Sequence, residues 1–151
     1  MSAVASFTKL PRTSLDGLRQ ATAQGGFDRF LQQHGEPVAD YEWSGFVLAT
    51  LLTYLDEQQI QLMKSEHDEL ATFLSQRLQA TCFILTDAHR LAYVDRLAPE
   101  CFSKQKLGEY YNEFNAADEL DAGQPMLDGI RALRKSLSEL NVDSVIVFCI
   151  A

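Results

Sequence analysis

The alternation of apolar and polar positions predicts strands at both ends of the chain. Residues 3–10 alternate loosely between the two kinds of side chain, which is typical of a strand, and Pro11 ends that pattern. Residues 145–150 form a continuous apolar run, as expected for a strand that is covered on both faces. A third short strand is predicted at 81–85 from the run Thr-Cys-Phe-Ile-Leu.

Helical spacing of apolar side chains accounts for most of the chain between these strands. It predicts helices from Ser14 to Gly25, over 27–34, over 65–79, from Ser103 to Phe114 and from Pro125 to Leu140. Each is bounded by residues that begin or end helices, such as serine before the first turn and glycine after the last.

Two interpretations are open for residues 86–97. A helix that begins at Thr86 and Asp87 would place Leu91, Val94 and Leu97 toward the interior. A β-hairpin that turns at 87–90 is the alternative, because a short apolar run fits either structure.

Residues 40–55 are predicted to form the central helix. Asp40 is a suitable N-cap, Glu42 in the first turn would complement the helix dipole, and Trp43 would be buried inside the helix. A buried strand over 46–52 is the competing interpretation. Gly45 costs about 1 kcal/mol relative to alanine inside a helix, and close approach of another backbone would explain its presence.

These elements predict a single α+β domain over residues 1–151. It would contain a small mixed sheet that includes both terminal strands, packed by six or seven helices. The composition is that of an ordinary globular protein, with 46% hydrophobic and 23% charged residues.

Charge and chain composition narrow the classes of partner. The net charge is −8, and the acidic excess is concentrated between Glu36 and Asp121. Such a surface repels a phosphate backbone, so nucleic acid is not expected as a partner. It would attract a basic partner, although acidity also serves simply to keep a small protein soluble.

No membrane association is predicted, because the longest apolar runs are far shorter than the ~20 residues that span a bilayer. The N-terminus lacks the pattern of a signal peptide, so a cytoplasmic location is expected.

No catalytic, metal or cofactor site is predicted. Cys82, Cys101 and Cys149 are widely spaced, without a zinc pattern, and are interpreted as structural free thiols. The histidines stand apart from one another, and neither a nucleophile elbow nor a phosphate-binding glycine loop is present.

The most site-like feature joins acidic and aromatic residues. Asp118, Glu119 and Asp121 follow a helix that carries Tyr110 and Tyr111, and such groups can anchor an arginine or lysine through charge and cation–π contact. A solvated acidic loop after a helix with core tyrosines is the other interpretation. Tyr41 and Trp43 are candidates to line a pocket.

Three segments resemble the YfbM-like bacterial domains of unknown function. They are residues 1–14, the pattern Asp40-x-x-Trp43-x-Gly45-Phe46-x-x-Ala49-x-Leu51-Leu52, and the final helix and strand from Met126 to Ile150. The chain departs from that family where a histidine is usual, having Val47 and Leu48 there, and Tyr54 follows Leu51-Leu52-Thr53 in place of glycine. The resemblance implies an α+β fold with the terminal strands in one sheet, and no established activity.

The function predicted from these observations is that of a non-catalytic, cytosolic bacterial binding protein. It could be an immunity-type or regulatory protein whose acidic surface covers a basic partner such as a toxin domain. The alternative is a small-ligand-binding protein or an enzyme with a pocket near Trp43, Tyr110 and Tyr111.

Overall fold

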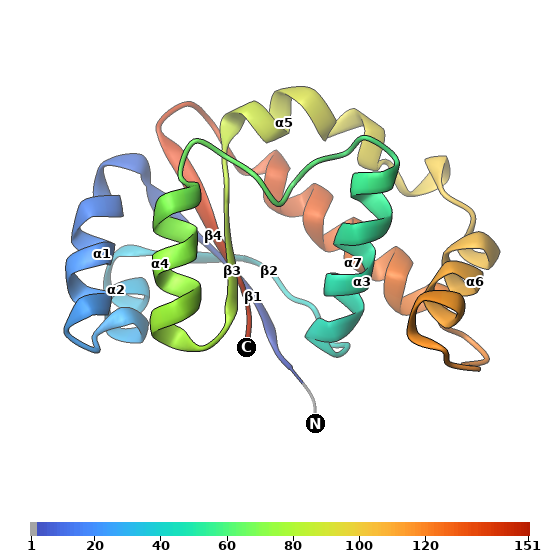
Figure 1. Ribbon diagram of the computed structural model, residues 1–151. Coiled ribbons are helices and arrows are strands. Elements are labelled where there is room, and N and C mark those ends of the chain that lie inside the picture. The colour runs from blue at the N-terminus through green and yellow to red at the C-terminus, as the bar shows by residue number, and fades with distance from the viewer. Residues whose placement is uncertain (1–2) are drawn as a thin grey trace.

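A four-stranded antiparallel sheet lies at the centre of the computed structural model, which describes residues 3–151 (Figure 1). The strands are β1 (Ala5–Pro11), β2 (Glu36–Ala39), β3 (Thr81–Leu85) and β4 (Ser144–Ile150), in the spatial order β2-β1-β4-β3. The predicted α+β class and the inclusion of both terminal strands are therefore confirmed. The sheet is antiparallel in every strand pair rather than mixed.

Seven α-helices occupy the described part of the chain. They are α1 (Leu15–Ala23), α2 (Phe27–His34), α3 (Gly45–Glu57), α4 (Asp68–Leu78), α5 (Asp87–Tyr93), α6 (Lys104–Asn115) and α7 (Gly123–Ser138). Short 3-10 turns stand at Arg12–Ser14, Asp95–Leu97 and Pro99–Cys101. The helix over 27–34 and the strand over 81–85 are confirmed, and the last helix begins two residues before Pro125.

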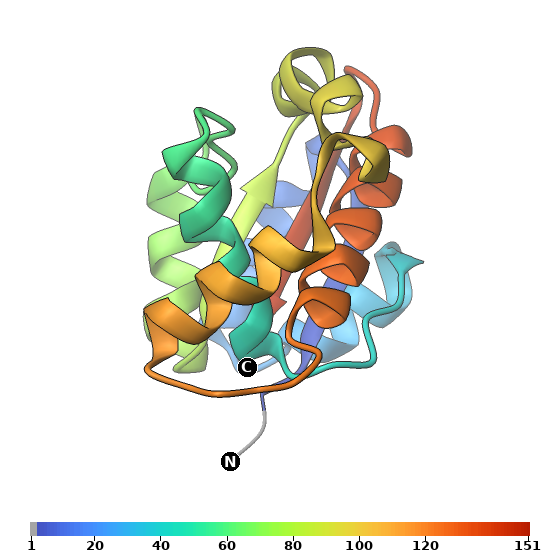
Figure 2. The ribbon, with the colours of Figure 1, turned by 90° about the vertical axis from the view of Figure 1, so that its right-hand side faces the viewer.

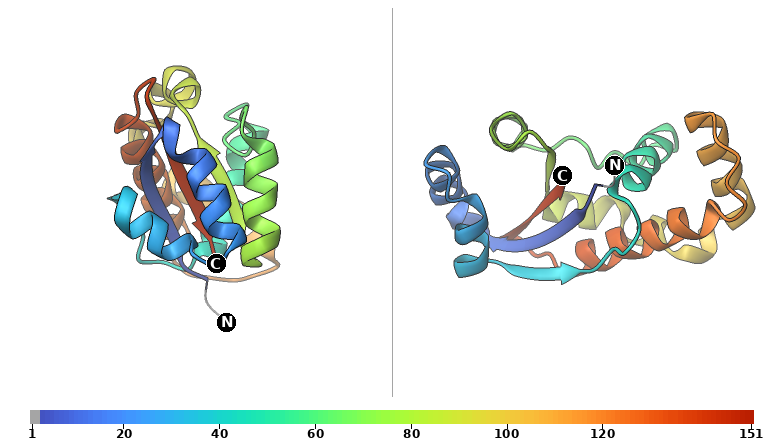
Figure 3. Two further views of the ribbon diagram at one scale, coloured as in Figure 1. Left: turned by 90° about the vertical axis from the view of Figure 1, so that its left-hand side faces the viewer. Right: turned by 90° about the horizontal axis from the view of Figure 1, so that it is seen from below.

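Helices cover both faces of the sheet, so the molecule has two apolar cores (Figures 1 and 3). One core packs α1, α2 and α4 against side chains of the sheet that include Leu10, Ile84 and Val147. The other packs α3, α6 and α7 against the opposite face, through Phe7, Phe148 and Ile146 among others. Every residue of β4 is buried, as predicted for a strand covered on both faces.

The apolar stripe of α7 is the main support of the second core. Met126, Ile130, Leu133 and Leu137 are fully buried, at alternating spacings of four and three residues along the helix. Gly129 on the same helix lets α3 approach, since a Cβ there would lie 2.8 Å from Leu51 Cδ2. This contact holds α7 close against α3.

Residues 86–97 are helical, which excludes the hairpin. Thr86 is the N-cap of α5, and a capping box closes through His89, whose Nδ1 accepts a hydrogen bond from the Thr86 backbone nitrogen at 3.0 Å. Leu97 is buried as predicted, but Leu91 is 71% exposed. The inward prediction for Leu91 is wrong because α5 is short and packs through His89 instead.

The helix predicted to begin at Asp40 begins at Gly45. Ser44 is the N-cap, and its hydroxyl accepts a hydrogen bond from the backbone nitrogen of Phe46. Residues 36–39 form the edge strand β2, so Asp40 and Glu42 lie in the segment between strand and helix. The prediction that Trp43 is buried in this helix is therefore wrong: Trp43 precedes the helix and is 45% exposed.

Gly45 lies where the helix meets the N-terminal strand. Its backbone nitrogen donates a hydrogen bond of 2.7 Å to the Ala3 carbonyl, and a Cβ would lie 3.4 Å from the Ala3 carbonyl carbon. The predicted close approach of another backbone is confirmed.

Candidate functional site

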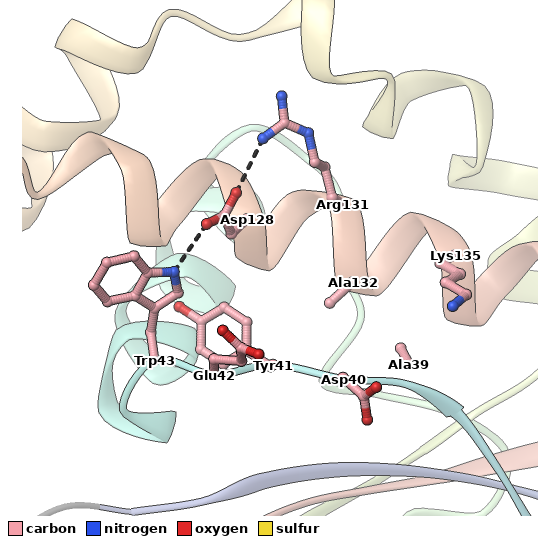
Figure 4. A pocket seen from close by; sticks show the side chains of 9 residues that line it. All are labelled: Ala39, Asp40, Tyr41, Glu42, Trp43, Asp128, Arg131, Ala132 and Lys135. Carbon is pink, nitrogen blue, oxygen red and sulfur yellow. Dashed lines mark hydrogen bonds and ion pairs between the residues drawn. The ribbon is translucent and has the colours of Figure 1, made fainter.

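Trp43 is held at the surface by a carboxylate of α7 (Figure 4). Its indole nitrogen donates a hydrogen bond of 2.8 Å to Oδ2 of Asp128. The other carboxylate oxygen accepts hydrogen bonds from Gln124 at 2.8 Å and from Arg131 at 3.0 Å. Burial alone would raise the pKa of Asp128, but these three donors outweigh it and hold the pKa below its ordinary value. Asp128 is thus a fixed negative charge that orients the indole.

Tyr41 anchors the segment before α3 and also lines a surface hollow. Its hydroxyl donates a hydrogen bond of 2.7 Å to the carbonyl oxygen of Pro125, and its ring is buried. Burial, with a further contribution from the negative charge of Asp128, raises the pKa of Tyr41 far above its ordinary value. The side chain therefore stays neutral and fastens residues 40–44 to the first turns of α7.

Two surface hollows flank the indole of Trp43. The first, of about 340 Å³, is lined by Tyr41 and Trp43 together with acidic and basic side chains, which are Asp40, Glu42, Asp128, Arg131 and Lys135 (Figure 4). The second, of about 270 Å³, is lined by Trp43, Val47, Tyr111, Glu119, Asp121, Ala122 and Pro125. We call this second site the Trp43–Tyr111 hollow. It combines two aromatic rings with two carboxylates.

The acidic rim of the Trp43–Tyr111 hollow is fixed in place by α6. The side-chain amide of Asn112 donates to the Glu119 carbonyl at 3.0 Å and accepts from the Glu119 nitrogen at 3.0 Å. Lys104 at the start of α6 lies 3.3 Å from Asp121. Glu119 forms no ion pair within residues 3–151, so its charge is available to a partner.

The predicted partner-binding residues divide between two places. Glu119, Asp121 and Tyr111 lie together with Trp43 around one hollow, where the alternative interpretation of the sequence also placed a pocket near Trp43 and Tyr111. Asp118 is exposed beside the hollow without lining it.

Tyr110 points instead toward α3. Its ring lies 4.9 Å from that of Tyr54, and its hydroxyl donates to Glu57 at 3.2 Å. Burial, together with the Glu57 carboxylate, raises the pKa of Tyr110.

An exposed apolar group, which the sequence did not reveal, lies at the same end of the molecule as the Trp43–Tyr111 hollow. Phe46, at the start of α3, and Phe114, at the end of α6, are each 53% exposed, and Leu120 in the following loop is fully exposed. The start of α3, the end of α6 and the α6–α7 loop lie at the same end of the fold (Figure 2). A hydrogen bond of 3.2 Å from Asn115 to Thr50 joins α6 to α3 there.

Asp128 was also missed, although its spacing offered a signal. Gln124, Asp128 and Arg131 recur at helical intervals on the side of α7 opposite the apolar stripe, so they share a face. Nothing local indicated that Trp43, 85 positions earlier, would meet that face.

Within residues 3–151, no three His, Cys, Asp or Glu side chains are grouped so that they could hold a metal ion. None of the helices in the described part of the chain combines the length and the apolar character needed to cross a bilayer.

No protein-family model, no curated protein and no solved structure matches the chain. The resemblance to YfbM-like domains therefore stays a prediction.

Proposed function

We propose that this chain is a non-catalytic binding protein that receives a basic protein partner at the Trp43–Tyr111 hollow. The observation that carries the proposal is the meeting of two aromatic rings with the carboxylates of Glu119 and Asp121 around one surface hollow. Aromatic faces attract cations, and neighbouring carboxylates add charge attraction and hydrogen-bond acceptors.

An arginine side chain of the partner fits this chemistry best. Its planar guanidinium can stack on the indole of Trp43 while it donates two hydrogen bonds to one carboxylate. Glu119 is the natural acceptor because Asp121 already faces Lys104 at 3.3 Å. The guanidinium would thus meet an aromatic face and an unpaired charge at the same point.

The surroundings of the hollow suit a protein rather than a free cation. Phe46, Phe114 and Leu120 add exposed apolar area at the same end of the molecule. Exposed apolar groups near a charged rim are typical of protein interfaces, where buried aromatic anchors supply most of the affinity. The net charge of −8 would increase the rate of association with a basic partner.

An immunity-type or regulatory role is the biological form that we favour. In it, this face covers the basic surface of a toxin domain in the bacterial cytoplasm. Asp128 argues for binding over catalysis, since its carboxylate already accepts three hydrogen bonds and its pKa lies below the ordinary value.

The alternative is a small ligand in the neighbouring hollow beside Tyr41. Its volume of about 340 Å³ falls at the lower end of the range for small-molecule sites. Arg131 and Lys135 in its lining would favour an anionic ligand. Binding there would be strengthened rather than weakened by removing nearby acidic groups such as Glu42.

Fluorescence of Trp43 gives a direct test, because it is the only tryptophan in the chain. We expect an arginine-rich peptide to change its emission at low salt, and a glutamate-rich peptide of equal length to leave it unchanged. The effect should weaken as salt rises, since the attraction is largely electrostatic.

Charge reversal locates the binding site. Glu119→Lys/Asp121→Lys should reduce peptide affinity at least ~10-fold, as expected for loss of two charge contacts. The matched control is Asp28→Lys/Glu36→Lys, which changes the net charge equally but alters α2 and β2. Equal losses in both variants, or no response to the arginine-rich peptide, would refute the proposal.

If the peptide binds as expected, the product of a neighbouring gene is the first protein to test by the same titration.

A further inference from the structure

Cys82 and Cys149 lie directly opposite each other on adjacent strands of the sheet. They are register partners on the adjacent antiparallel strands β3 and β4, and their Sγ atoms lie 2.6 Å apart. Directly opposite residues of an antiparallel pair have Cα atoms about 4.5 or 5.5 Å apart. Both separations fall within the range of about 4.4–6.8 Å that a disulfide spans. The backbone therefore needs no rearrangement for these two thiols to be joined.

The pair is isolated from other thiols. Both side chains are buried in the core beneath α1, α2 and α4, with exposed fractions of 3% for Cys82 and 5% for Cys149. Cys101 is exposed and lies in the turn Pro99–Cys101, which precedes α6. An oxidised Cys82 would thus meet Cys149 before any thiol of another molecule.

Cys82 is the member of the pair that borders a surface hollow. It lines a surface hollow of about 380 Å³ between α4 and β3, together with Ser75, Thr81 and Phe83. The pKa of Cys82 lies below its ordinary value, chiefly because the Cys149 thiol donates a hydrogen bond to it and secondarily because of Ser75. A lowered pKa increases the fraction of the reactive thiolate. The hydrogen bond to Cys82, together with burial, raises the pKa of Cys149, which keeps its proton.

We propose that Cys82 and Cys149 form a site of reversible oxidation, at which hydrogen peroxide joins β3 to β4 through a disulfide. The Cys82 thiolate attacks one peroxide oxygen, the O–O bond breaks, and the departing hydroxide takes a proton to become water. The sulfenic acid on Cys82 is then attacked by Cys149, which loses its proton as the S–O bond breaks and a second water leaves. Two thiols are oxidised by two electrons and one peroxide is reduced to two waters. A dithiol reductant reverses the reaction by exchange.

The disulfide would join the edge strand β3 to β4, one of the two inner strands of the sheet. β3 lies at one edge of the sheet, and the chain between the two cysteines contains α5, α6 and α7. Closing a long segment restricts the unfolded chain, so the oxidised protein should melt at a higher temperature. The Trp43–Tyr111 hollow draws residues from within this closed segment, and oxidation would therefore stabilise the frame that carries it.

The test uses the full chain with Cys101→Ser, which removes the exposed thiol and leaves the pair intact. The protein is treated with hydrogen peroxide, the excess is removed, and thiols are counted in denaturant. We expect both thiols to disappear, the intact mass to fall by two hydrogen atoms, and a nonreduced digest to yield a peptide joining Cys82 to Cys149. The melting temperature should rise by several degrees and return after dithiothreitol.

Single-cysteine variants distinguish the roles of the two thiols. With Cys149→Ser added, whose hydroxyl can still donate a hydrogen bond to Cys82, peroxide should leave a sulfenic acid on Cys82 that dimedone traps. With Cys82→Ala added, Cys149 should not react. Thiols that survive peroxide in the Cys101→Ser protein would overturn the proposal, as would added oxygen on the cysteines or a disulfide-linked dimer. If either of these variants does not fold, the thiol count and peptide map of the Cys101→Ser protein still decide the question.

Discussion

The indole nitrogen of Trp43 lies 2.8 Å from Oδ2 of Asp128, so a side chain between β2 and α3 is fastened to the outer side of α7. Because the Asp128 carboxylate accepts two further hydrogen bonds from its own helix, it cannot rotate to follow the indole. The ring is thus held between two hollows, and it lines both of them.

Replacement of Trp43 should affect binding far more than folding. Trp43→Ala removes a half-exposed ring and one hydrogen bond, so we expect a loss of about 1–2 kcal/mol in the free energy of unfolding. Urea denaturation followed by circular dichroism measures it. Leu51→Ala, at a fully buried position of α3, is the comparison and should cost about 2–5 kcal/mol. A Trp43→Ala protein as unstable as Leu51→Ala would show that the indole serves the core.

Asp128→Asn tests whether the carboxylate orients the indole. The amide is uncharged, and it loses the charge-assisted part of its bonds to Trp43 and Arg131. We expect the emission of Trp43 to shift to longer wavelength and its quenching by acrylamide to increase, while stability falls by only about 1 kcal/mol because the group is partly exposed. Asp95→Asn, on the 3-10 turn after α5, is the control and should change neither spectrum nor quenching. Unchanged emission in Asp128→Asn would mean that ring packing alone holds Trp43.

Local signals account for the parts of the fold that the sequence predicted well. Gly26 and Gly35 flank α2, and the buried positions of α7 follow helical spacing. Residues close in sequence therefore determine both helices. The start of α3 depends instead on a distant backbone, because the Ala3 carbonyl accepts from Gly45. Aspartate and serine are both preferred N-cap residues, so the local sequence did not distinguish Asp40 from Ser44 as the cap of this helix.

The same reasoning explains what was predicted of the candidate site. Glu119, Asp121 and Tyr111 were found because they are close in sequence and share an acidic or aromatic character. Their meeting with Trp43 depends on how α6 and α7 pack against α3, which is a tertiary relationship. Strand β2 escaped prediction because it has only four residues, includes Pro37 and pairs only with β1, at the edge of the sheet.

Stability should decrease when His89 is protonated. Nδ1 of His89 accepts from the Thr86 backbone nitrogen at 3.0 Å, while Nε2 lies 2.7 Å from the Lys64 carbonyl and donates to it. Burial lowers the pKa of His89 below the ordinary value of 6.5, since the charged form loses its hydration.

The direction of the pH dependence follows from this lowered pKa. As pH falls below about 6.5, His89 takes up a proton in the unfolded chain before it does so in the folded protein. The free energy of unfolding is therefore greatest above pH 6.5. It decreases as the pH falls toward the lower pKa that His89 has in the folded protein. Melting temperatures measured between pH 7.5 and pH 5 should therefore fall more steeply in the native protein than in His89→Gln. His34→Gln, at an exposed position, should retain the native slope. Parallel slopes in all three proteins would contradict the role of His89.

Gly123 lies at a tight contact between α6 and α7, and a side chain there should disrupt both packing and the acidic rim. A Cβ on Gly123 would overlap the backbone carbonyl oxygen of Lys104, and one on Gly108 would lie 3.0 Å from the Gly123 nitrogen. Because backbone atoms cannot move aside as a flexible side chain does, Gly123→Ala should lower the free energy of unfolding by about 2–3 kcal/mol.

The same substitution should weaken peptide binding, since α6 would move away from α7 and carry with it Asn112, which holds Glu119. Gly26→Ala is the matched control, because its Cβ would have only an ordinary contact of 3.4 Å with the Ala21 carbonyl oxygen and should cost less than about 1 kcal/mol. Urea denaturation gives the stabilities, and Trp43 fluorescence gives the affinity for the arginine-rich peptide. If Gly123→Ala bound that peptide as tightly as the native chain, the spacing of α6 and α7 would not be what positions the acidic rim, and Glu119 would owe its place to the loop itself.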